Sequence, residues 1–123
     1  MSGKLSIGVD IVSINRFSEK AKLNPKFLSK WFSSSELDYC FSKKNAPLHL
    51  SGRFAAKEAV IKALNQNNGS VIRMHEVEII GDGKSSPVVK LNSEKFKDLE
   101  ILVTISHNSE NAIAFSIVNE RGD

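Results

Sequence analysis

The sequence predicts one α+β domain over residues 1–123, in which antiparallel strands pack against a central helix. Three observations predict this class. The chain has the length of one ordinary domain, with 41% hydrophobic and 25% charged residues. Strand-like alternation appears near both ends, and an alanine-rich helical pattern lies between them. Mixed strands and helices in this order are typical of an α+β domain.

The first element is a strand over residues 4–14. Leu5, Ile7 and Val9 alternate with smaller or polar residues, so a period of two places Gly8 and Asp10 together on the polar row. Further alternating runs predict four more strands, the first two of which flank a turn at Gly81-Asp82-Gly83: residues 76–80, 88–91, 101–105 and 112–118.

Ser33 to Glu36 forms a capping box, in which the Ser33 hydroxyl accepts from the Glu36 amide and the Glu36 carboxylate reaches back to Ser33. A helix is therefore predicted from Ser33 to about Phe41. The remaining segments are predicted as a loop or helix interrupted by Pro25 (residues 15–30), two loops (43–48 and 65–69) and a short helix (92–99).

The strongest helix pattern covers Ser51 to Leu64. Its alanines gather on one small apolar face, and Glu58 and Lys62 lie one turn apart on the opposite side. Arg53 and Lys57 border this charged stripe, which we expect at the protein surface.

The cysteine count, the apolar segments and the distribution of charge each exclude some classes of protein. Cys40 is the one cysteine, so no intrachain disulfide forms, which fits a reducing cytosol. We see no secretory signal at the N-terminus and no apolar run long enough for a membrane span. Residues 1–62 carry a net charge of +6 and residues 63–123 one of −3. The basic half is either a solvated face or a surface for an acidic partner and a polyphosphate; no basic stripe with interleaved aromatic residues supports nucleic acid.

Asp10 and Glu58 are candidate ligands of Mg²⁺, which takes one or two carboxylates and completes its octahedron with water and phosphate. Arg53 and two lysines of the same helix, Lys57 and Lys62, could bind phosphate oxygens beside it. The alternative is that Asp10 ends a strand while Glu58 pairs with Lys62. His107 follows the run 101–105, where it could bind phosphate, act as an acid or base, or cap a loop. His49 and His75 have no chemically useful neighbours in sequence, and the histidine spacing excludes an ordinary zinc site.

Three segments together resemble the holo-acyl-carrier-protein synthases, a family of 4'-phosphopantetheinyl transferases. Residues 7–12, followed by Ile14 and Arg16, are similar to the N-terminal motif of that family. Residues 51–59, continuing through Lys62-Ala63-Leu64, match its central helix, and residues 105–108 resemble its C-terminal motif. The order and spacing agree over nearly the whole chain.

The resemblance implies transfer of 4'-phosphopantetheine from coenzyme A to a serine of apo-acyl carrier protein, in support of fatty acid biosynthesis. It also implies a cytoplasmic homotrimer with active sites between subunits. Asp10 and Glu58 would hold the magnesium ion, and Lys62 would contact the pyrophosphate of coenzyme A. Glu58, or a metal-activated water acting with Asp38, would be the base. Arg16 would contact the acidic helix of the carrier protein.

The same resemblance assigns the nucleotide end of coenzyme A to Arg53, His107, Lys44 and Pro87. The sequence departs from the family at two places. Residues 65–67 read Asn-Gln-Asn where the family usually has Gly-Thr-Gly, and Ser85-Ser86 precede Pro87 where it has Gly-Lys. Neither change affects the proposed metal ligands.

Two other functions fit parts of the pattern. A non-catalytic module that binds carrier proteins could share the fold, but it would be expected to lack Asp10, Glu58 or Lys62. Another metal-dependent phosphate enzyme, such as a phosphohydrolase, would need further groups to position water, and the sequence shows no additional carboxylate or histidine cluster.

Overall fold

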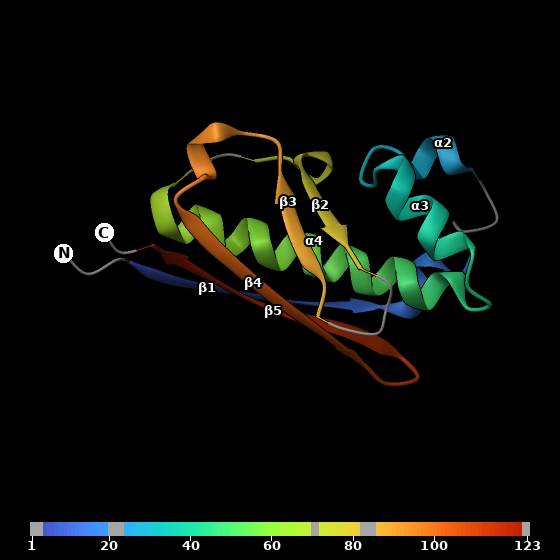
Figure 1. Cartoon of the computed structure of the whole chain (residues 1–123). Coiled ribbons are helices and arrows are strands. Elements are labelled where there is room, and N and C mark those ends of the chain that lie inside the picture. The colour runs from blue at the N-terminus through green and yellow to red at the C-terminus, as the bar shows by residue number, and fades with distance from the viewer. Residues whose placement is uncertain (1–3, 20–23, 70–71, 82–85, 122–123) are drawn as a thin grey trace.

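A 23-residue helix, α4 (Ala46–Asn68), lies at the centre of the computed structural model and contacts most of the other elements. The structure describes residues 4–19, 24–69, 72–81 and 86–121. Figure 1 shows α4 running along a sheet, with two short strands crossing it and two small helices near its N-terminal end. The other elements are β1 (Leu5–Ser13), η1 (Ile14–Phe17), α2 (Pro25–Leu28), α3 (Ser34–Phe41), η2 (Met74–Glu76), β2 (Val77–Ile80), β3 (Val88–Leu91), η3 (Glu94–Phe96), β4 (Leu99–His107) and β5 (Asn111–Glu120).

The strands form two antiparallel sheets. One has the order β1-β5-β4, so β1 and β4 are its two edges, and the other is the β2–β3 pair. All five strands were predicted, and the α+β class is confirmed. None of the helices in the described ranges is both long and apolar enough to cross a membrane.

The polar row of β1 faces α4, and its aliphatic row faces outward. Ser6 and Gly8 are buried, whereas the side chains of the aliphatic row are 50–63% exposed. Alternation alone would favour burial of the aliphatic row. The reason for the reverse is space: a Cβ at Gly8 would lie against the carbonyl oxygen of Ala59 and 2.8 Å from the amide nitrogen of Ala63. The helix backbone therefore approaches β1 as closely as only glycine allows.

The ends of α4 differ from the prediction. The helix begins at Ala46, because Asn45 accepts a hydrogen bond from the Leu48 amide and Pro47 lies in the first turn, where its missing N–H costs nothing. It continues through the predicted loop 65–69 and ends at Gly69, whose φ of 70° closes it in the left-handed conformation. The predicted helix over 92–99 is only the short η3, followed by β4. Asp82 and Gly83 of the predicted turn lie outside the described residues.

The capping box of α3 is present, and its glutamate also makes a buried ion pair. Glu36 accepts from the Ser33 amide at 2.8 Å, from Lys57 Nζ at 2.6 Å and from the Ile79 amide at 2.8 Å. Both charged side chains are fully buried. The expectation that Lys57 borders a charged surface stripe, where it could bind phosphate oxygens, was therefore wrong. Helix periodicity placed it at the border of the apolar face, and α3 covers that border.

We expect Gly8→Ala to destabilise the protein by about 3 kcal/mol or more, because the new methyl meets helix backbone that cannot move aside. Urea unfolding followed by circular dichroism measures the change. Gly52→Ala is the matched control, since its methyl would meet only the end of the Ile105 side chain at 3.2 Å. That control should stay within about 1 kcal/mol of wild type. A Gly8→Ala protein as stable as the control would contradict the close packing.

We expect Lys57→Met to cost about 3–5 kcal/mol of unfolding free energy, because it leaves the Glu36 carboxylate buried without its counter-charge. The double variant Glu36→Gln/Lys57→Met removes both charges but keeps only one acceptor oxygen for the two amides of Ser33 and Ile79. It should regain part of the loss in the same urea measurement. Equal stabilities of the single and double variants would show that the pair is not electrostatically coupled.

Candidate functional site

The first group of candidate residues lies where β1 meets the middle of α4. Lys62 Nζ lies 3.2 Å from Asp10 Oδ1 and donates to the Val9 carbonyl at 2.9 Å. The Asp10 side chain is 16% exposed and the Lys62 side chain is 54% exposed. Burial raises the pKa of Glu58, and the negative charge of Asp10 raises that pKa further. The two carboxylates are therefore close enough for their charges to repel each other.

These carboxylates fit a magnesium ion. In the described part of the chain, no cluster of three or more histidine, cysteine, aspartate or glutamate side chains could hold a metal. A pair of carboxylates suits Mg²⁺, which fills its remaining positions with water and substrate phosphate. A cation between Asp10 and Glu58 would also remove the repulsion that the raised pKa of Glu58 reports.

Arg16 lies on the same side of the molecule. Its guanidinium carbon is 4.5 Å from the centre of the Phe54 ring and 5.7 Å from that of Trp31. Its positive charge lowers the pKa of Glu58, opposing the effect of Asp10. Stacking on two aromatic rings holds the exposed guanidinium near the carboxylates while leaving its donors available to another molecule.

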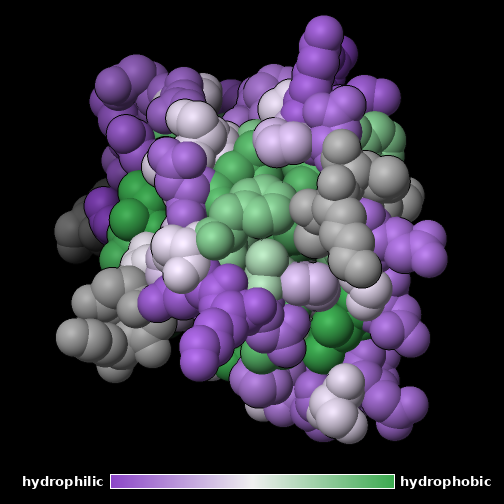
Figure 2. Space-filling view, turned by 90° about the vertical axis from the view of Figure 1, so that its right-hand side faces the viewer, coloured by the Kyte–Doolittle hydropathy of each residue, from purple (hydrophilic) through white to green (hydrophobic). Residues whose placement is uncertain are grey.

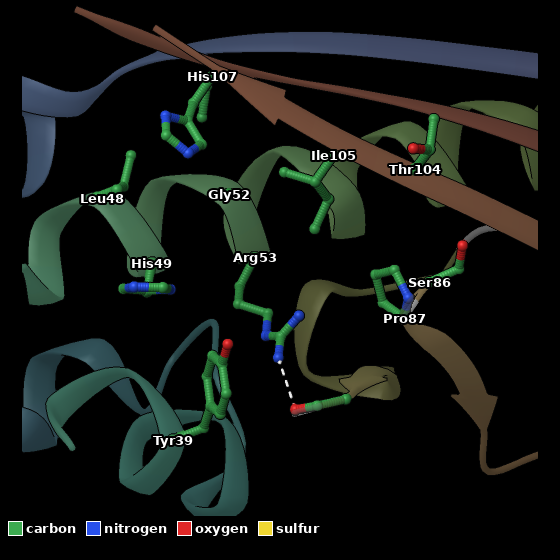
Figure 3. A pocket seen from close by; sticks show the side chains of 12 residues that line it. Tyr39, Leu48, His49, Gly52, Arg53, Ser86, Pro87, Thr104, Ile105 and His107 are labelled. Atoms are coloured by element: carbon green, nitrogen blue, oxygen red, sulfur yellow. Dashed lines mark hydrogen bonds between the residues drawn. The ribbon is translucent and has the colours of Figure 1, made fainter. Parts of the chain in front are cut away.

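The second group lines a pocket of about 350 Å³ between α3, α4, β4 and the segment before β3 (Figure 3). Arg53, Pro87 and His107, which the sequence grouped together, all line this pocket. Arg53 and His107 come from different elements, and Pro87 from the segment entering β3, so the fold itself brings them together. Lys44 is exposed just before α4 and is not among the lining residues.

Arg53 is the most deeply placed cation of the pocket. Its side chain donates from Nη2 to the Gly81 carbonyl at 3.2 Å, and its guanidinium carbon lies 4.3 Å from the centre of the Tyr39 ring. The residue is only 6% exposed, yet its Nε has no hydrogen-bond partner among the described residues. A buried guanidinium with a free donor beside a cavity is suited to bind an anion, phosphate in particular.

Sequence reasoning missed two residues of this pocket, Tyr39 and His49. His49 precedes Arg53 by four residues, a spacing that places two side chains on one helix face. The signal was hidden because the predicted helix began only at Ser51. Asp38, a candidate base, is exposed on α3, and no hydrogen bond or ion pair between described residues joins its carboxylate to Glu58 or Asp10.

The two groups lie on different sides of α4. Arg53 and Glu58 are five residues apart, which rotates their side chains by about 140° around a helix. Asp10 lies on one edge of the three-stranded sheet, and His107 on the other. None of the three residues of the carboxylate group lines the pocket. One chain therefore presents two separate half-sites, one suited to a metal and one to a phosphate.

Comparison with known proteins gives a consistent result. The family model of the 4'-phosphopantetheinyl transferase superfamily matches residues 6–116. A holo-[acyl-carrier-protein] synthase of Protochlamydia amoebophila is 38% identical over 117 residues, covering 92% of this chain and 96% of that protein.

Solved structures agree in fold. The holo-[acyl-carrier-protein] synthase of Helicobacter pylori in complex with coenzyme A has a TM-score of 0.76 and 34% identity, covering 91% of this chain and 98% of that one. The ACPS–CoA complex of Chronobacterium ammoniagenes has a TM-score of 0.78 and 27% identity, covering 97% and 99%.

Proposed function

Because the chain belongs to the 4'-phosphopantetheinyl transferase superfamily, we propose that it transfers 4'-phosphopantetheine from coenzyme A to apo-acyl carrier protein. A serine hydroxyl of the carrier attacks the phosphorus next to pantetheine. The bond from that phosphorus to the bridging oxygen breaks, the serine proton leaves, and adenosine 3',5'-bisphosphate is released. The observation that supports this proposal most directly is the match of the family model to residues 6–116, a range that includes every proposed site residue. We take residues 1–123 as one transferase domain that serves fatty acid biosynthesis.

Asp10 and Glu58 would hold Mg²⁺ against the pyrophosphate of coenzyme A. The bound ion would neutralise negative charge on the pyrophosphate oxygens. Lys62, whose side chain is half exposed beside Asp10, would donate to the leaving phosphate. Glu58 is the base that we favour, because it lies with this group while Asp38 is exposed on α3.

Arg53 and His107 would hold phosphate at the nucleotide end of coenzyme A, with Pro87 forming part of the wall. The pocket volume, the free Nε of Arg53 and the position of His107 in the pocket wall support this assignment. Lys44, exposed just before α4, is a further candidate for the same phosphates.

We propose a homotrimer with active sites between subunits. Two observations support it. The half-sites for metal and phosphate lie on different sides of α4, so a neighbouring copy could place one half-site opposite the other. The outward face of the three-stranded sheet is also largely apolar over β1 and β5. Its exposed hydrophobic side chains are those of Leu5, Ile7, Val9, Ile11, Leu102, Ile113 and Phe115, and polar residues of β4 lie at one edge. An exposed apolar face of this extent is typical of a protein–protein interface.

Carrier protein would dock near Arg16. The exposed lysines of the segment around Trp31, Lys26 and Lys30, add positive charge for an acidic partner. Figure 2 looks onto the end of the molecule that bears α2 and α3, and it shows an apolar patch ringed by hydrophilic residues. An apolar centre with a polar rim is the usual anatomy of an interface.

We place the protein in the cytoplasm, in keeping with the buried free thiol of Cys40.

One experiment tests the activity. The protein is incubated with coenzyme A, Mg²⁺ and apo-acyl carrier protein, and the carrier is weighed by mass spectrometry. The carrier should gain one phosphopantetheine group. Phosphate release without modification would indicate a phosphohydrolase instead, and binding of the carrier without any reaction would indicate a non-catalytic module.

We expect Glu58→Gln to reduce kcat/KM by at least about 100-fold, since it removes charge that acts on the reacting phosphates. It should also stabilise the metal-free protein at neutral pH. The folded state raises the pKa of Glu58, so the ionised carboxylate opposes folding above that pKa and stops doing so once protonated.

Thermal unfolding without metal, measured from pH 7 down to pH 4, checks the second effect. The stabilising difference should shrink as the pH falls through the range in which Glu58 takes up its proton. Glu94→Gln, a change at an exposed residue of η3, should alter neither activity nor stability. A Glu58→Gln protein with wild-type turnover would exclude this carboxylate from the metal site.

We expect Arg16→Gln to raise the KM for carrier protein roughly tenfold, equivalent to about 1.4 kcal/mol, while the KM for coenzyme A stays unchanged. Glutamine avoids placing another negative charge beside Glu58. Steady-state kinetics at saturating Mg²⁺ separates the two KM values. Lys97→Gln, which removes an exposed charge next to η3, is the control. Equal increases in both KM values would argue against docking at Arg16.

A further inference from the structure

His49 is a second histidine of the phosphate pocket, and none of the roles assigned above uses it. It is half-buried in the first turns of α4, four residues before Arg53. His107 approaches the same cavity from the end of β4 (Figure 3). The pocket therefore combines one guanidinium group with two imidazole side chains.

Tyr39 organises the basic side chains around the cavity. The His49 and Tyr39 rings meet edge to face, with their centres 5.7 Å apart. The Tyr39 ring also lies 4.3 Å from the guanidinium carbon of Arg53 and 5.0 Å from Lys43 Nζ. No described residue forms a hydrogen bond or an ion pair with the His49 imidazole. The ring is thus packed in place while its nitrogens stay available to a ligand.

The charges around His49 have one sign. They come from Lys43 after α3, from Arg53 on α4 itself and from His107 on β4. Burial lowers the pKa of His49, and these three groups lower it further, so the free protein favours the neutral imidazole. A phosphate dianion in the pocket would reverse the sign of this field.

We propose that His49 binds the phosphate held by Arg53 and takes up a proton as that phosphate enters, so that coenzyme A binding consumes a proton. The inference rests on the proposed function, which supplies coenzyme A as the ligand. Arg53 keeps its charge at all relevant pH values and so gives an attraction that does not vary with pH. His49 adds an attraction that appears only when a phosphate monoester is present. It thereby favours coenzyme A over the same molecule without its terminal phosphate.

This model fixes the direction in which the affinity for coenzyme A changes with pH. The pKa of His49 lies below its ordinary value in the free protein, and a bound phosphate would raise it. The affinity for coenzyme A should therefore increase as the pH falls through the bound-state pKa, by up to about tenfold per pH unit for one proton, and level off below the free-state pKa. Dephospho-coenzyme A, which lacks the terminal phosphate, should show no such dependence.

Titration calorimetry at pH 7.5 in two buffers of different ionisation enthalpy counts the protons taken up on binding. The second pKa of a phosphate monoester is about 6, so the ligand is already a dianion at this pH. We expect proton uptake with coenzyme A and none with dephospho-coenzyme A. Protons linked to metal and pyrophosphate cancel in this comparison, because both ligands carry the pyrophosphate.

Two histidine variants make the assignment specific. His49→Gln should lose most of the proton uptake and most of the gain in affinity between pH 8.5 and pH 6.5. His75→Gln, a matched change at an exposed residue of η2, should keep both. In the wild-type protein, the NMR signal of the His49 ring should move to the imidazolium position when coenzyme A is added at pH 7.5, a readout that needs no variant.

Several outcomes would overturn the inference. Unchanged uptake in His49→Gln, uptake lost only in His107→Gln, or a His49 signal that stays neutral in the complex would each exclude His49. Full transfer to carrier protein without proton uptake would refute the inference alone and leave the proposed function intact. Failure of coenzyme A to bind at any pH would refute both.

Discussion

The contact between Gly8 and the backbone of α4 is the constraint on which most of the structure depends. Because a glycine stands at this point of β1, the helix lies directly on the small and polar row of the strand. Asp10, two residues further along the same row, is therefore placed beside Lys62 and Glu58. The same contact turns the aliphatic row outward. One close approach thus creates both a carboxylate pair and an exposed apolar face.

The buried ion pair between Glu36 and Lys57 has a comparable role on the other side of α4. It joins the start of α3 to the helix and, through the Ile79 amide, to β2. Tyr39 belongs to that α3 helix, and Gly81, which accepts from Arg53, follows β2 directly. A mispositioned α3 or β2 would leave the guanidinium of Arg53 without its ring and its acceptor. Neither Glu36 nor Lys57 lines the pocket around Arg53, yet the ion pair helps to position the elements that form it.

The sequence predicted the parts that depend on local rules. The strands followed from alternation, the start of α3 from its capping box, and the buried alanine face of α4 from helix periodicity. Prediction from the sequence failed where the burial of a residue depends on an element distant in the chain. Periodicity cannot show that α3 covers Lys57, nor that α4 selects the polar row of β1. The sequence pattern places Pro47 in a loop, although proline also suits a first helical turn. Because the predicted helix begins after it, the pattern does not show that His49 and Arg53 lie on one face of α4.

The proposed homotrimer would account for both the two half-sites and the apolar sheet face. A single chain separates its carboxylate pair from its phosphate pocket by the width of α4, whereas one molecule of coenzyme A carries both pyrophosphate and terminal phosphate. A neighbouring copy that covers the apolar face of β1, β5 and β4 would bury that face. It would also bring a second set of half-sites to the edges of the sheet, where Asp10 and His107 lie. Under this arrangement the exposed aliphatic row of β1 contributes to function, since the association it drives completes the site that Gly8 began to form.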